Sequence, residues 1–130
     1  MKCWQLQITT NVDGRETVTE RMGEVTIDGS SVKLVYAEES AVVTLTIAEK
    51  NALVKREGDY GLFLSLREGE KTDGSITLSG SQGTLTVKTD KVRCLIKDNA
   101  SALLILQYVI YFGDEPQEMK LRLVANKRSD

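Results

Sequence analysis

Polar and apolar residues alternate along most of this chain, and a two-residue period is typical of β-strands that bury one face. Near the start, Trp4, Leu6 and Ile8 share one face while glutamine and threonine residues occupy the other. Short stretches rich in Asp, Asn and Gly separate the alternating segments and favour tight turns. The strands predicted in this way cover residues 2–10, 15–27, 32–36, 42–47, 52–57, 60–66, 76–78, 85–96, 101–112 and 119–125.

Three segments depart from simple alternation. The apolar face changes sides next to Gly23, which predicts a bulge or a bend in one long strand. It changes sides again across Thr89-Asp90, which predicts either a tight hairpin or a bulge. Residues 37–50 begin and end with good helix formers, but the β-branched run 42–47 between them favours a strand.

These segments amount to nine or ten strands with short links, and no helix is predicted. Consecutive strands joined by short turns form an antiparallel meander, and a sheet of that many twisted strands usually closes on itself. The sequence therefore predicts an all-β fold, an antiparallel up-and-down barrel of eight to ten strands, in a single domain over residues 1–130. A two-sheet sandwich is the alternative.

Composition narrows the chemistry that the chain can perform. Lys and Arg number 17 against 19 Asp and Glu, and there is no histidine. The lack of histidine excludes Ser-His and Cys-His pairs and every histidine metal site. The paired carboxylates, such as Glu38-Glu39 and Asp114-Glu115, fall in turns or on outward positions, where water surrounds them. We therefore expect no catalytic residue, no cofactor and no metal, and hence no enzyme.

Patterning also bears on partners and location. No apolar run approaches the roughly 18 residues of a membrane-spanning helix, and no signal-peptide pattern opens the chain, so we expect a cytoplasmic protein with no membrane partner. Cys3 and Cys94 are far apart and are expected to be free thiols, with Cys94 on an apolar face. Nucleic-acid binding is not expected, because aromatic stacking platforms do not accompany the basic residues. Those basic residues are Lys88, Lys91, Arg93, Lys97, Lys120 and Arg122.

Four aromatic residues fall on the predicted inner faces of their strands. They combine an apolar body with a polar tip, so together they suit a pocket for a small apolar or amphipathic ligand. The alternative is that they fill the core and bond to the backbone. Trp4 is also a candidate for a cation–π contact with Arg122 or Arg128 at a closed barrel end. The four residues are Trp4, Tyr36, Tyr60 and Tyr108.

Residues 101–112 are apolar on both faces of the predicted strand. The outward set would stand in solvent, and an apolar patch of this kind usually marks a contact surface. The sequence thus predicts a homodimer or a partner site there, unless residues 69–83 or the end of the chain cover it. The outward residues are Leu103, Ile105, Val109 and Tyr111.

Several strand motifs, in order, resemble the YwiB-like family of bacterial proteins. They are Met22-Gly23-Glu24 through Asp28-Gly29 to Tyr36, then Leu66-Arg67-Glu68-Gly69, Gly83-Thr84-Leu85-Thr86-Val87 and Leu104-x-Leu106-x-Tyr108-x-Ile110. The resemblance implies a calycin-like or lipocalin-like β-barrel. Residues 78–82 depart from the family, whose members tend to carry a Tyr-x-Thr-Pro type loop at this point.

The family has no established activity, so two functions stay open. The first is a binding barrel for a small apolar or amphipathic ligand, held by the four aromatic residues. The second is a protein-interaction module that acts through its outer surface and has a filled interior.

Overall fold

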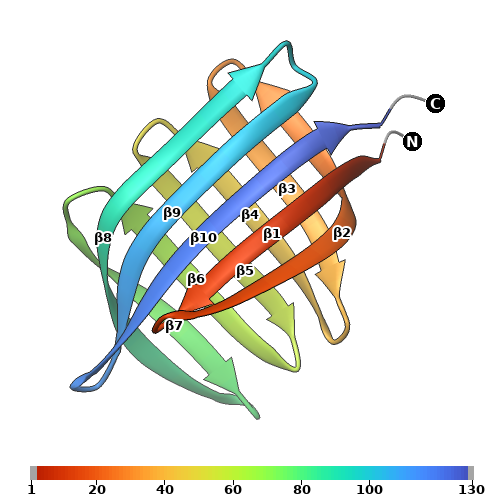
Figure 1. Ribbon diagram of the computed structural model, residues 1–130. Coiled ribbons are helices and arrows are strands. Elements are labelled where there is room, and N and C mark those ends of the chain that lie inside the picture. The colour runs from red at the N-terminus through yellow and green to blue at the C-terminus, as the bar shows by residue number, and fades with distance from the viewer. Residues whose placement is uncertain (1–2, 129–130) are drawn as a thin grey trace.

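The computed structural model describes residues 3–128, which form ten antiparallel strands closed into a barrel (Figure 1). Each strand pairs with its neighbours in the chain, and the first strand pairs with the last. The predicted up-and-down barrel is confirmed, although the strand start predicted at residue 2 lies outside the described residues. The strands are β1 (Trp4–Val12), β2 (Arg15–Asp28), β3 (Ser31–Glu38), β4 (Ala41–Ala48), β5 (Asn51–Gly58), β6 (Tyr60–Arg67), β7 (Lys71–Leu78), β8 (Ser81–Lys97), β9 (Ser101–Phe112) and β10 (Glu115–Lys127).

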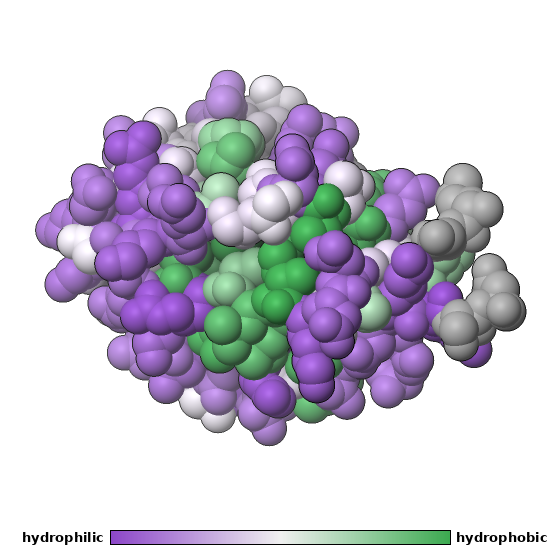
Figure 2. Space-filling model, turned by 90° about the horizontal axis from the view of Figure 1, so that it is seen from above, coloured by the Kyte–Doolittle hydropathy of each residue, from purple (hydrophilic) through white to green (hydrophobic). Residues whose placement is uncertain are grey.

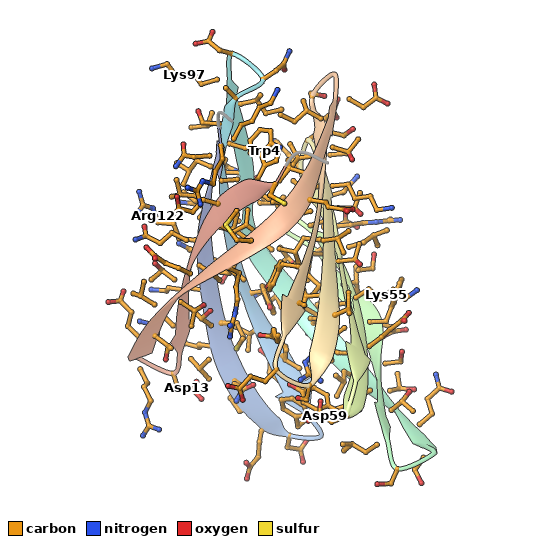
Figure 3. The ribbon with its side chains drawn as sticks, turned by 90° about the vertical axis from the view of Figure 1, so that its right-hand side faces the viewer. Trp4, Asp13, Lys55, Asp59, Lys97 and Arg122 are labelled. Carbon is orange, nitrogen blue, oxygen red and sulfur yellow. The ribbon has the colours of Figure 1, made fainter. Side chains whose placement is uncertain are left out.

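The two ends of the barrel carry different turns. The turns that follow β1, β3, β5, β7 and β9 lie at what we call the lower end, and the other turns lie at the upper end (Figure 1). Figure 3 accordingly shows Asp13 and Asp59 low and Trp4 and Lys97 high. Asp13 and Gly14 both have positive φ, at 50° and 88°, as a two-residue type I′ hairpin turn requires.

Alternation places one face of every strand in the core. On β4 the side chains of Ala41, Val43, Leu45 and Ile47 are buried, so the strand preferred for residues 42–47 is confirmed and the helix alternative is wrong. Leucines from opposite walls are fully buried at the centre, including Leu34 and Leu104. Residues 3–128 contain no helix of the length and hydrophobicity that would cross a membrane.

The change of face at Thr89-Asp90 is a β-bulge inside the single long strand β8, and not a hairpin. The bulge frees backbone groups, and the turn between β6 and β7 binds them. The Thr89 N–H donates to the Glu70 carbonyl at 3.1 Å, and the Thr89 carbonyl accepts from Gly69 at 2.8 Å. The Glu68 carboxylate accepts from the Val92 N–H at 2.9 Å. The bulge therefore anchors that turn to the barrel wall.

At Gly23 the strand bends without a bulge, because the register of β2 runs through it unbroken. Gly23–Asp28 pair with β3, whereas Arg15–Met22 pair, among the described residues, with β1 alone. Figure 3 shows the lower half of β2 diverging from β3. A Cβ at Gly23 would lie 2.6 Å from the Val35 carbonyl oxygen and 2.8 Å from Leu6 Cδ1, so only glycine fits where the strand changes partners.

The sequence predicted that the outer face of β9 would stand in solvent, but the structure shows its side chains half-buried. Leu103, Ile105, Val109 and Tyr111 are all half-buried. On either side, β8 and β10 place long side chains beside them, as when Arg93 and Arg122 flank Ile105. Such side chains cover apolar surface with their hydrocarbon stems. Residues 69–83, the alternative cover for this face, lie mostly in the barrel wall itself, in β7 and at the start of β8.

Candidate functional site

A pocket of about 330 Å³ opens at the lower end of the barrel, and we call it the lower pocket. Its volume lies at the small end of the range for ligand sites. Inner-face side chains of β6, β7, β9 and β10 form it, most of them apolar. The lining residues are Tyr60, Leu62, Ile76, Leu78, Tyr108, Ile110, Phe112, Gln117 and Met119.

All four predicted aromatic residues lie on the inner face, but they do not converge on one cavity. Tyr60 and Tyr108 line the lower pocket. Tyr36 is buried at the same end of the barrel, near the end of β3. Trp4 lies at the upper end, where it lines a separate depression of about 280 Å³ with Val25 and other residues (Figure 3). The expectation of a single four-residue site is therefore wrong for Trp4.

Arg56 on β5 holds Tyr60 in place at the mouth of the pocket. Its guanidinium lies 3.7 Å from the centre of the Tyr60 ring and donates to the Tyr60 carbonyl at 2.8 Å. Ion pairs join it to Asp59 at 2.8 Å and to Glu38 at 3.4 Å. Sequence reasoning missed Arg56, although it continues the inward alternation of Ala52 and Val54.

Within residues 3–128, the arginine that stacks on a ring is Arg56, and neither Arg122 nor Arg128 stacks on Trp4 as the sequence suggested. Arg122 lies on the outer face, opposite Thr9 and Ile105 (Figure 3). Its strand position points it away from the barrel interior, so it cannot reach the indole.

Arg21 on β2 is a second inner-face arginine that sequence reasoning missed. It pairs with Leu6, whose side chain is fully buried, and directly paired residues of antiparallel strands point to the same face. Its guanidinium forms no hydrogen bond or ion pair with any of residues 3–128. Arg21 thus lacks, among residues 3–128, the acidic partners that Arg56 has at the same end of the barrel.

Two buried phenols, Tyr36 and Tyr108, lie at the lower end of the barrel, and Tyr108 lines the lower pocket. Burial is the main cause that raises the pKa of Tyr36; Glu38 and Tyr108 raise it further, and Arg21 lowers it. Burial also raises the pKa of Tyr108 to about 12. Both hydroxyl groups therefore stay protonated at neutral pH and keep an O–H to donate.

The upper end is apolar at its centre. Seen from above, hydrophobic side chains gather in the middle of the face and hydrophilic ones border them (Figure 2).

Both cysteines are free, as expected; Cys3 is exposed and Cys94 is half-buried on the inner face. Burial raises the pKa of the Cys94 thiol, so the reactive thiolate is scarce there.

Comparison with known proteins identifies relatives of this chain. A family model described as a domain of unknown function, DUF1934, matches residues 4–123. The crystal structure of ywiB protein from Bacillus subtilis matches with a TM-score of 0.82 and 18% sequence identity, covering 98% of this chain and 93% of that one. At this identity the match shows a shared fold. No curated protein matches the chain in sequence.

Proposed function

The chain belongs to the DUF1934 family, in agreement with the resemblance seen in its strand motifs, and we propose that it is a binding protein for a small apolar or amphipathic ligand. The observation that carries the proposal is the lower pocket, an apolar recess of about 330 Å³ with tyrosine hydroxyl groups and one glutamine. Binding sites for small molecules combine an apolar lining with a few polar groups in this way.

We favour binding over catalysis because the two acidic groups that flank Arg56 at the mouth of the pocket are already engaged. Asp59 and Glu38 both pair with Arg56. The hydrogen bond from Arg56 is the main cause that lowers the pKa of Asp59, which makes this carboxyl a poor proton donor at neutral pH. The proposal places the protein in the cytoplasm, where free thiols such as Cys3 and Cys94 are the usual state.

The test is a calorimetric titration of the protein with 1-octanol, a neutral amphiphile. We expect saturable binding that Met119→Trp abolishes, because Met119 lines the lower pocket and the larger ring fills it. Val124→Trp is the matched control, since Val124 lies on the outer face of the same strand. Absence of binding to the folded wild type, or equal loss in both variants, would show that the lower pocket is not a ligand site.

A second candidate function, protein interaction through the outer surface, rests on the half-buried apolar side chains of β9. A homodimer centred on Leu103, Ile105, Val109 and Tyr111 would bring Arg93 and Arg122 of both copies close together, because the same surface faces itself across a two-fold axis. We therefore expect such a dimer to tighten as salt screens the cations.

Sedimentation of the wild type and of Ile105→Lys tests this function. The interface predicts a wild-type dimer that the lysine disrupts. A wild type that stays monomeric at high micromolar concentration, or a variant that sediments like a wild-type dimer, rules it out.

A further inference from the structure

We propose that the lower pocket selects an amphiphile with one negative charge, whose apolar part fills the pocket and whose anionic group binds the guanidinium of Arg21. This inference rests on the proposed function and names the chemical class of its ligand. A medium-chain carboxylate is the simplest member of that class.

The first observation is that Arg21 has no hydrogen-bond or ion-pair partner among residues 3–128. It is half-buried on the inner face, where a charge without a counter-charge is costly. Glu38 is the next inward position on β3 beyond the last backbone pair, as Arg21 is on β2, but the Glu38 carboxylate pairs with Arg56. An anionic ligand group would supply the missing charge, and guanidinium binds carboxylate with two parallel hydrogen bonds.

The second observation is that strand pairing places Arg21 next to the side chains at the mouth of the lower pocket. Beyond the last backbone pair, Gly23 and Tyr36, the next inward positions of β2 and β3 are Arg21 and Glu38. Glu38 pairs with Arg56, and Arg56 stacks on Tyr60 of the pocket lining. The charge of Arg21 also lowers the pKa of the buried Tyr36, in line with this placement. The Tyr36 and Tyr108 hydroxyl groups are protonated donors at neutral pH, as shown above. The O–H of Tyr108 therefore lies in the pocket lining, and the buried Tyr36 and the cation of Arg21 lie at the same end of the barrel, which suits an anionic head.

The third observation is the split in the barrel wall at Arg21. Backbone pairing between β2 and β3 ends at Gly23 and Tyr36, so Arg21 lies just beyond the last pair. Here the strand carries polar inner residues, Thr17 and Thr19 as well as Arg21, in contrast to the apolar inner residues Val25 and Ile27 above the bend. The polar half-strand suits a hydrated head, and the apolar lower pocket suits a hydrocarbon tail.

Calorimetric titration with three probes of equal chain length tests the proposal: octanoate, 1-octanol and octylammonium. We expect octanoate to bind the wild type most tightly. Arg21→Gln should weaken octanoate binding by roughly 10- to 100-fold, as expected for one lost charge-assisted interaction, and leave 1-octanol unchanged. Arg21→Lys keeps the charge and should restore part of the affinity. Arg122→Gln, an exposed outer-face arginine, is the matched control and should bind all three probes like the wild type.

The outcomes separate this proposal from the proposed function. If octanoate and 1-octanol bind equally, Arg21→Gln has no effect and Met119→Trp still abolishes binding, the anionic class is wrong while the lower pocket stands as a ligand site. If no probe binds the folded wild type, both proposals fail. A thermal melt of each variant shows that it is folded, and because Arg21 has no partner among the described residues, its replacement should not lower the melting temperature.

Discussion

Replacing Gly23 with alanine tests the close approach that lets β2 change partners. The new Cβ would lie 2.6 Å from the Val35 carbonyl oxygen, 2.8 Å from Leu6 Cδ1 and 3.2 Å from Tyr36 Cβ. Leu6 is fully buried and Val35 contributes a backbone atom, so neither can move aside cheaply. Overpacking of this kind costs about 1–3 kcal/mol, and the stiffer unfolded chain returns about 0.4–1 kcal/mol. We expect Gly23→Ala to destabilise the protein by about 1–2 kcal/mol.

Gly83→Ala is the matched control, because Gly83 also lies in a strand and its Cβ would meet Ile76 Cγ2 at an ordinary 3.5 Å. That variant should be neutral or more stable by up to about 1 kcal/mol. Urea unfolding followed by circular dichroism measures both free energies of unfolding, and a thermal melt should place Gly23→Ala about 5 °C below the wild type. Equal stability of the two variants would refute the proposed close approach.

Three further predictions concern stability and reactivity. Thr89→Val should stabilise the protein by about 1 kcal/mol in urea unfolding, because the buried Thr89 hydroxyl has no hydrogen-bond partner within residues 3–128. The control Thr86→Val, on the exposed face, should leave stability unchanged, and a loss of stability in Thr89→Val would mean that the Thr89 hydroxyl has a hydrogen-bond partner. Hydrogen bonds from the Val92 N–H and then from Arg93 lower the pKa of Glu68, so the Glu68 carboxylate stabilises the fold at neutral pH and loses this effect as the pH falls through the lowered pKa. The difference in unfolding free energy between the wild type and Glu68→Gln should therefore shrink from pH 7 to pH 3, and a constant difference would contradict this. Cys94 should react with a thiol reagent more slowly than the exposed Cys3 until urea unfolds the chain, and equal native rates would show that Cys94 is accessible.

The fold could be predicted almost completely from the sequence, because each strand buries one face and each turn carries its own signal. The exceptions lie at positions where the apolar pattern and the backbone geometry of a strand do not agree. At Gly23 the apolar side changes because the lower half of β2 is polar inside, while the side-chain alternation continues. A strand that keeps its period but changes chemistry looks, in sequence, like a strand with a bulge. At Thr89 the apolar side changes because the backbone itself is irregular, with a β-bulge between Thr89 and Lys91.

The candidate site was only partly predictable, because alternation gives the face of a residue but not its height along the barrel. Trp4 and Tyr36 share an inner face, yet one lies at the start of a descending strand and the other near the end of one. Arg21 and Arg56 were missed because inward positions were expected to be apolar. Strict alternation predicts both positions: Arg21 is two residues from the inward Gly23, and Arg56 is two residues from the inward Val54.

The closure of the barrel by β1 and β10 has a consequence for the order of folding during synthesis. Until β10 has emerged from the ribosome, β9 is the open edge of the growing sheet, with free backbone groups along its length. This same strand is apolar on both faces, a combination that promotes pairing between chains. A chain in which β10 has not yet paired therefore exposes an apolar strand edge, and we expect such chains to be more prone to aggregate than the closed barrel.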